Sequence, residues 1–240
     1  MLYAYETQNK NNDLIKYLES VQDSNINIQD NSGKTILHYA CESNNIDIVK
    51  YTVSLNSFNF DLKDESGKNI LHGACESGNV DLIKYLISLN KIDVNDKDKN
   101  QQTILHYGCQ NENLDVIKYL ISLNKIDINS KDNSGRTILH CACKFGHVNI
   151  VKYIISLQKI DVKSLDNSEK TILHYGCESG NFELVQYLIS LNQIDVNSND
   201  NLGKNILFYA CNSGNAFLVK YLVSLNLVDL NAKDNDGKTI

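Results

Sequence analysis

The chain has 240 residues, of which 42% are hydrophobic, and a formal charge of −6, a composition that suits one large soluble domain or two small ones. Acidic and basic residues are interspersed, so there is no basic footprint for nucleic acid or for an anionic membrane. The longest apolar stretches, such as YLISL at 85–89, are too short to cross a bilayer, and the N-terminus lacks the basic and apolar regions of a signal peptide.

Cysteine usage points to a reducing environment. Seven cysteines, an odd number in a chain of this size, disfavour a disulfide framework and favour free thiols. We therefore expect a cytoplasmic protein with no nucleic-acid partner, no membrane insertion and no small-molecule substrate.

A period of 34 residues organises the whole chain. Six full repeats are predicted, with a partial repeat at 1–31 before them and the start of another at 236–240 after them. The full repeats span 32–65, 66–99, 100–133, 134–167, 168–201 and 202–235, which we treat as one domain over 1–240. The repeating columns are His38, His72, His106, His140 and His174, then Cys41, Cys75, Cys109, Cys143, Cys177 and Cys211, and Tyr17, Tyr51, Tyr85, Tyr119, Tyr153, Tyr187 and Tyr221.

The first segment, residues 1–31, is predicted to be a capping repeat. Met1 falls in the register of Thr35, so the chain opens on an inner helix. Glu6, Thr7 and Gln8 are polar where the internal repeats carry Ala-Cys and a variable residue. A terminal repeat with one face toward water is expected to differ in this way.

Each full repeat predicts two short helices, and the fourth repeat shows the pattern. Thr137 is a good N-cap for a first helix through about Lys144, and Gly146 is expected to end it in the left-handed conformation. A second helix follows from about Val148 to Leu157, with an apolar face formed by Val148, Ile150, Val151, Ile154 and Ile155. Helices this short do not persist alone in water, so the repeats must stack into a solenoid.

The last residues, DNDGKTI, begin a further repeat and stop at its second helical position. They form no polar cap comparable to the N-terminal segment. We therefore expect the 240 residues to be a fragment of a longer chain.

The repeat resembles the ankyrin repeat. The pattern D-x-x-G-x-T-x-L-H-x-A-C-x-x-G resembles the family's D-x-x-G-x-T-P-L-H-x-A-A-x-x-G, and IDVN resembles its A-D-V-N. The tetratricopeptide repeat has the same period, but its Trp, Leu-Gly and Pro positions have no counterparts here. The resemblance implies an all-α solenoid of stacked helix-turn-helix units with hairpin-like connecting loops. In the fourth repeat the pattern is carried by Asp132, Gly135, Thr137, Leu139, His140, Ala142, Cys143 and Gly146.

Three features depart from the family pattern. Isoleucine replaces the T-P-L-H proline, so the first turn of the inner helix is expected to fray more readily. The repeat is one residue longer than the usual 33, which predicts a longer second helix or an enlarged loop after it. The turn glycine is replaced by Gln101 and Glu169, and each replacement costs about 1 kcal/mol if that position keeps a positive φ.

The stretch GRTILHCACKFGH, residues 135–147, could be mistaken for a metal or thiol site, because His140 and Cys143 share a helix face. However, the His-x-x-Cys pair occurs in five repeats, whereas an active site occurs once. Helices of successive repeats pack about 8–10 Å apart, too far for ligand atoms that must lie about 2.0–2.3 Å from one zinc ion. We therefore predict no enzyme activity, no metal and no cofactor. The resemblance implies that Thr and His fix the turn and that cysteine packs between helices.

Columns that vary without a packing reason indicate where a partner binds. In the resembled family, the turn tips and inner helices form a concave binding face. Repeats one, two and five carry Lys, Glu and Ser at three slots of that face, whereas repeats three and four differ. We predict a protein-binding surface there, enriched in cationic and aromatic side chains, although drift on a solvated face gives the same pattern. The predicted residues are Lys99, Asn100, Gln102, Gln110, Asn133, Arg136, Lys144 and Phe145.

The predicted function is a non-catalytic scaffold that binds a protein partner on this face. The alternative is a structural spacer, in which near-identical repeats set the distance to another domain of a longer chain.

Overall fold

The computed structural model describes residues 26–55 and 57–240. The predicted cap residues Glu6, Thr7 and Gln8 lie outside these ranges, as does Tyr17. Contacts divide the chain into two compact units, Met1–Lys99 and Asn100–Ile240. The boundary falls at the end of the second predicted repeat.

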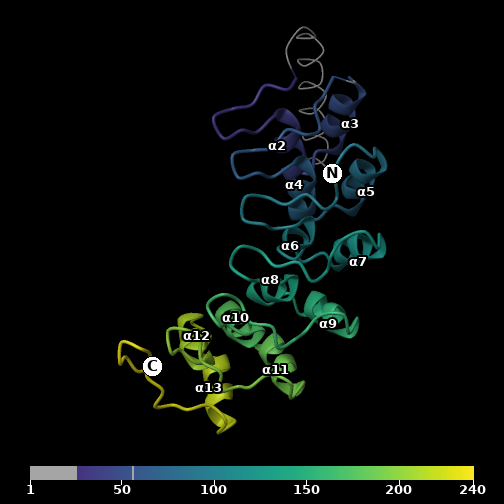
Figure 1. Ribbon diagram of the computed structural model, residues 1–240. Helices are drawn as coiled ribbons and strands as arrows, with labels where there is room; N and C mark the ends of the chain where they lie inside the picture. The colour runs from purple at the N-terminus through teal and green to yellow at the C-terminus, as the bar shows by residue number, and fades with distance from the viewer. Residues whose placement is uncertain (1–25, 56) are drawn as a thin grey trace, which may run out of the picture. The chain divides into compact units, whose positions relative to one another are not determined.

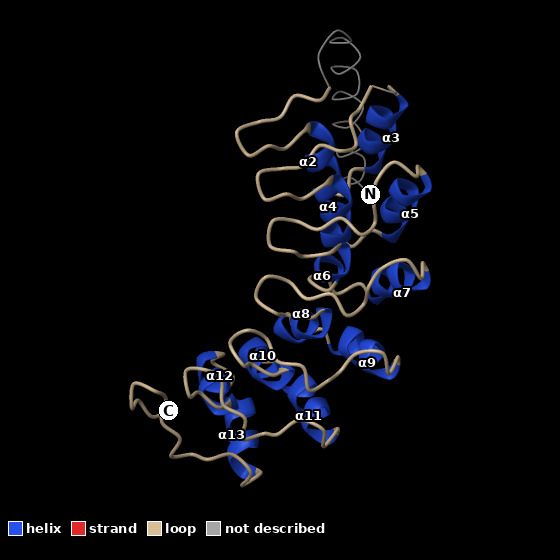
Figure 2. Ribbon diagram, viewed as in Figure 1, coloured by secondary structure: helices blue, strands red, loops and turns tan. Residues whose placement is uncertain are grey.

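Every described repeat contains an inner and an outer helix, and the described residues contain no strand (Figure 2). In the first compact unit the helices are α2 (Ile36–Glu42), α3 (Ile46–Ser54), α4 (Ile70–Ser77) and α5 (Val80–Ser88). In the second they are α6 (Ile104–Gly108), α7 (Leu114–Ser122), α8 (Ile138–Lys144), α9 (Val148–Ser156), α10 (Ile172–Ser179), α11 (Phe182–Ser190), α12 (Ile206–Asn212) and α13 (Ala216–Ser224).

Inner helices stack on inner helices within each compact unit (Figure 1). Helix α2 packs against α4 in the first unit, and α10 packs between α8 and α12 in the second. The loops that carry the turn tips leave the inner helices on the side away from the outer helices (Figure 1). None of the described helices is both long and apolar enough to span a bilayer.

The predicted limits of the inner helix are confirmed in the fourth repeat. Thr137 precedes the helix in an extended conformation, and α8 runs from Ile138 to Lys144. Gly146 then takes a φ of 74°, which a residue without Cβ adopts at little cost. Isoleucine occupies the first helical position, where the family pattern has proline.

The outer helices share one length and, from α5 onward, the same turn after them. Each outer helix has nine residues. A residue in the left-handed conformation lies two positions after the end of each outer helix from α5 onward. Asparagine tolerates this conformation better than most residues because its short polar side chain hydrogen-bonds locally. These residues are Asn90, Asn124, Gln158, Asn192 and Asn226, with φ between 51° and 53°.

The outer helices contribute a narrower buried face than predicted. In α9, Ile150, Val151 and Ile154 are fully buried, whereas Val148 and Ile155 are only half-buried. Burying each aliphatic side chain contributes about 1.5–3 kcal/mol, and neighbouring repeats provide the surface against which the chains are buried. The helix ends at Ser156, and Leu157 is its C-cap.

Outer-helix tyrosines pack between repeats. The described members of this column are half-buried. The Tyr221 ring meets Phe182 edge-on at 5.2 Å, and the Lys152 ammonium lies 5.5 Å from the centre of the Tyr187 ring. These contacts join the outer helices of successive repeats.

Candidate functional site

Each turn tip is built on one aspartate. Asp132 Oδ1 accepts hydrogen bonds from the backbone N–H groups of Ser134 and Arg136, both at 2.9 Å. Gly135, with a φ of 75°, lets the chain reverse. The next tip then joins the first, because the Asn167 N–H donates to the Ser134 carbonyl at 2.8 Å. Equivalent tip-to-tip bonds recur within both compact units.

The histidine column locks each tip to the inner helix. The Thr137 N–H donates to His140 Nδ1 at 3.2 Å, and the Thr137 hydroxyl lies 2.9 Å from the same nitrogen. Because Nδ1 accepts a bond, Nε2 carries the proton. In the repeat before, His106 Nε2 donates to the Arg136 carbonyl at 3.1 Å. His106 therefore connects its repeat to the next tip.

Burial favours the neutral form of three of these histidines, His38, His140 and His174. It lowers the pKa of His140 to about 4, against weaker opposing effects of Asp166 and the Lys170 carbonyl. Burial also lowers the pKa of His38 and of His174. Nδ1 of each of these rings contacts its threonine, and Nε2 of His38 and of His174 lies 3.3 Å from a carbonyl of the next tip, whereas the buried Nε2 of His140 has no hydrogen-bond partner within the described residues. The column therefore has a structural role.

The cysteine column is also structural. Burial raises the pKa of Cys141 to about 12 and raises the pKa of Cys143 further. All seven cysteines are free thiols, and only Cys211 is exposed. A thiol with a raised pKa is a poor nucleophile at neutral pH because little thiolate forms. Within the described ranges, no group of three or more His, Cys, Asp or Glu side chains is placed to hold a metal ion.

Arg136 hydrogen-bonds to the second carboxylate oxygen, Oδ2, of the tip aspartate Asp132. In the fifth repeat, the Tyr175 hydroxyl donates to Asp166 Oδ2 at 2.7 Å. The fourth repeat has Cys141 in the tyrosine slot, so its aspartate receives no phenol hydrogen bond. Arg136 takes over, with Nε 2.7 Å and Nη2 2.6 Å from Asp132 Oδ2. Arg136 is thus mainly a structural replacement for a missing tyrosine.

Lys144 and Phe145 are exposed, and Lys144 lacks the ion pair that its slot forms in three other repeats. In three other repeats, a tip lysine pairs with a glutamate in the slot of Lys144. With Arg136 turned toward Asp132, the ammonium of Lys144 has no ion pair or hydrogen bond within the described residues. Phe145 is 46% exposed and stacks on His147, with ring centroids 6.1 Å apart. The reference pairs are Lys34–Glu42 at 2.8 Å, Lys68–Glu76 at 3.1 Å and Lys170–Glu178 at 3.6 Å.

The remaining predicted contact residues are distributed over both compact units. Asn100 and Asn133 are exposed at successive tips, and the Asn133 N–H donates to the Asn100 carbonyl at 2.8 Å. Gln102 and Gln110 are half-buried, and the Gln110 carbonyl lies 3.1 Å from Nε2 of His147. Lys99 is the last residue of the first compact unit and is exposed. The sequence prediction thus combined residues of two units.

Two cavities in the first compact unit were not predicted from the sequence. One, of about 250 Å³, lies between the Lys34–Glu42 and Lys68–Glu76 pairs over Gly73. The difference in the tyrosine column could have revealed it, because glycine stands there in only one repeat.

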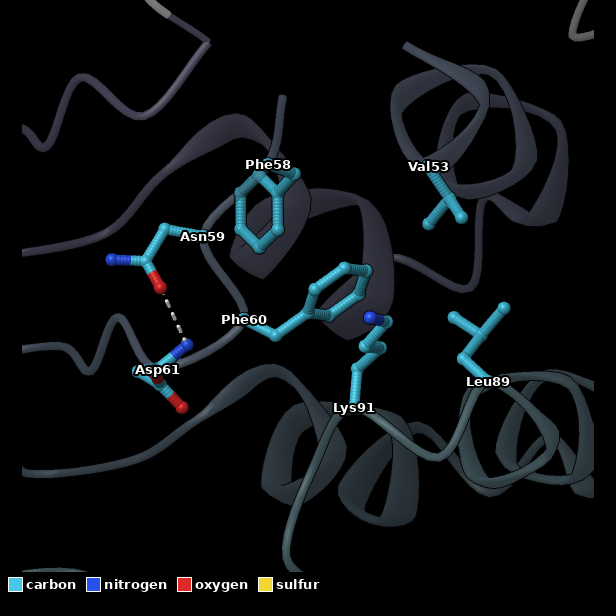
Figure 3. Close-up of a pocket in the computed structure, with 7 residues that line it drawn as sticks. All are labelled: Val53, Phe58, Asn59, Phe60, Asp61, Leu89 and Lys91. Atoms are coloured by element: carbon cyan, nitrogen blue, oxygen red, sulfur yellow. Dashed lines mark hydrogen bonds between the residues drawn. The ribbon is translucent and has the colours of Figure 1, made fainter. Parts of the chain in front are cut away.

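The other cavity, of about 380 Å³, lies beside the loop that follows α3. Figure 3 shows the Phe60 ring extending between Phe58 and Leu89, with Val53 on the far side and Lys91 beside it. The two phenylalanine rings meet edge-on at 5.3 Å, and they replace the isoleucine and valine of later repeats. The lining combines apolar walls with a few polar groups, and its described residues include no Ser, Thr, Cys or His side chain.

Paired helices, stacked through their tips and inner faces, define an all-α helical repeat solenoid. A family model of ankyrin repeats (3 copies) matches residues 1–98, 52–132, 88–166, 105–200 and 173–240. The chain belongs to the ankyrin repeat family. A search of curated proteins finds no match. Ankyrin repeats generally mediate protein–protein interaction and are typically non-catalytic, which supports a scaffold role for this chain.

Proposed function

We propose that the chain is a non-catalytic scaffold and that it binds a protein partner at the inner-helix end of the fourth repeat. The observation that carries the proposal is the pairing of Lys144, whose charge no described residue neutralises, with the exposed ring of Phe145. Three of the five sister repeats place glutamate and serine in these slots. An exposed aromatic ring beside a cation is a common centre of binding energy in protein interfaces.

The surrounding contacts favour a preformed surface. Phe145 stacks on His147, whose Nε2 donates to the Gln110 carbonyl of the preceding repeat. The ring is therefore supported from below, so little side-chain entropy is lost when a partner covers it. Lys144 suits a partner that presents a carboxylate near an apolar side chain.

The test uses residues that the chain itself accepts in these slots. The double variant Lys144→Glu with Phe145→Ser makes the fourth repeat resemble the first, second and fifth, and it leaves Arg136 in place. We expect it to lose the partner that the wild-type chain retains in affinity purification followed by mass spectrometry. The matched control is Lys118→Ala on outer helix α7, which removes only an exposed pair with Asp115.

A partner retained equally by the wild type and the double variant would exclude this location. Loss of the partner in the Lys118→Ala control as well would place the interface on another face. Circular dichroism of each variant must match the wild type, because misfolded protein also loses partners.

A further inference from the structure

The cavity over Gly73 stands in a slot that four sister repeats fill with tyrosine. It is bordered by the Lys34–Glu42 and Lys68–Glu76 ion pairs. Its volume of about 250 Å³ is smaller than a typical small-molecule site of about 300–1,000 Å³. A space of this size suits one side chain better than a whole ligand. The other residues of this column are Tyr39, Tyr107, Cys141, Tyr175 and Tyr209.

The fifth and sixth repeats show what surrounds a phenol in this slot. The Tyr175 hydroxyl donates to the second oxygen of the tip aspartate, Asp166. The Lys170 ammonium lies 5.4 Å from the centre of the Tyr175 ring and 4.5 Å from that of Tyr209. The slot therefore provides a carboxylate for the hydroxyl and an ammonium group for the ring face, where a cation–π contact is favourable.

The second repeat retains these groups without the ring. Asp64 Oδ1 accepts the N–H groups of Ser66 and Lys68 at 2.8 and 2.9 Å, as Asp132 and Asp166 do in their tips. No side chain in the described ranges donates to Asp64 Oδ2, although Asp64 is only 8% exposed. The tip lysines of the first and second repeats, Lys34 and Lys68, border the cavity.

Glycine is what keeps the slot open. A Cβ atom on residue 73 would lie 2.9 Å from Cγ of Glu42, so the glutamate side chain leans over the glycine. Its carboxylate is 2.8 Å from Lys34, and this partly exposed contact is weak enough to rearrange. A ring can enter once Glu42 swings aside, as the flexible end of a side chain readily does.

We propose that the cavity over Gly73 binds a tyrosine side chain of a partner protein, with its hydroxyl donating to Asp64 Oδ2 and its ring beside Lys34 and Lys68. The partner's ring occupies the place that the chain's own tyrosines occupy in other repeats. This inference rests on the proposed scaffold function but concerns a different repeat and a different compact unit from Lys144 and Phe145.

The direct test is a titration of the whole 240-residue chain with N-acetyl-tyrosinamide, followed by ¹H–¹⁵N NMR. We expect a dissociation constant on the order of 1 mM, in keeping with so small a ligand, and shifts centred on the Gly73 and Glu42 amides. N-acetyl-phenylalaninamide should bind roughly tenfold more weakly, because it cannot donate to the carboxylate. Equal affinity of the two probes, or shifts elsewhere, would overturn the proposal.

Two variants make the result independent of any one substitution. Gly73→Tyr installs the side chain of the sister repeats and should abolish the shifts. Tyr175→Gly opens an equivalent cavity beside Asp166 and should create a second binding position. Binding at the engineered position without binding at Gly73 would refute the natural site, and binding at neither would refute the whole inference. Because these probes need no natural partner, the result does not depend on the purification experiment at Lys144 and Phe145.

Discussion

Replacing Glu169 by glycine is expected to stabilise the protein, although it removes a side chain. Glu169 occupies the turn slot that glycine fills in most repeats, and its φ is 60°. The side chain is exposed. The sequence-based expectation of a positive φ at Gln101 and Glu169 is confirmed, because both have the same value.

The magnitude follows from two opposing effects. A residue with Cβ in the left-handed region costs about 1–2 kcal/mol relative to glycine. Glycine also gives the unfolded chain more freedom, which offsets about 0.4–1 kcal/mol. The net gain in the free energy of unfolding is about 0.5–1 kcal/mol, or a rise of about 1–4 °C in the melting temperature of a chain of this size.

Thermal unfolding followed by circular dichroism measures the change, and Gly135→Ala provides the opposite control. Gly135 has a similar φ, but a Cβ there would lie 2.3 Å from Asn167 Oδ1 and 2.8 Å from its backbone nitrogen. That variant should lower the melting temperature, because it adds strain and disturbs a tip-to-tip bond. A melting temperature that stays unchanged or falls in Glu169→Gly would refute the strain argument.

Three further results are expected. Arg136→Ala should destabilise the fold by about 1.5–3 kcal/mol in denaturant unfolding, because Asp132 loses its charged donors. Adding Cys141→Tyr should restore most of the lost stability. If the effects of the two substitutions simply add, Arg136 does not replace the missing tyrosine. The free energy of unfolding should fall by an amount on the order of 3 kcal/mol as the pH drops from about 6.5 toward 4. In this range His140 binds a proton in the unfolded chain but stays neutral when buried in the folded chain, because burial lowers its pKa to about 4. His140→Phe, which copies the sixth repeat, should flatten that slope in pH-dependent melts, and an unchanged slope would assign it to other groups. A thiol reagent should label one cysteine, Cys211, quickly in the folded chain and all seven after unfolding, whereas fast labelling of several would contradict the burial.

The inner-helix limits were predictable because their signals are local. A threonine before the helix and a glycine after it act within one turn, so their effect is visible in the sequence around Thr137 and Gly146. After the outer helix, the sequence predicts either a longer helix or an enlarged loop. Nothing in the local sequence distinguishes a longer helix from a left-handed residue such as Asn90.

The predicted contact surface stays a prediction, and it rests on comparing the repeats one column at a time. Compared in this way, Arg136 differs from the tip lysines, whereas the structure shows that it contacts Asp132 Oδ2 in a repeat where Cys141 replaces the tyrosine. This substitution is visible only from the distance between the Arg136 guanidinium and Asp132 Oδ2, which the sequence does not give. Gly73 was overlooked because a missing side chain changes neither charge nor polarity.

The sequence by itself determined the period, the helix pair, the tip turns and the buried columns, since each depends on residues close together in the chain. Only the tertiary structure decided which donor reaches the second oxygen of each tip aspartate, and where a repeat leaves that oxygen unused. Such contacts depend on how stacked repeats direct their side chains, and a small change in one column shifts them. Asp132 with Arg136, and Asp64 beside Gly73, have the same local turn but opposite surroundings.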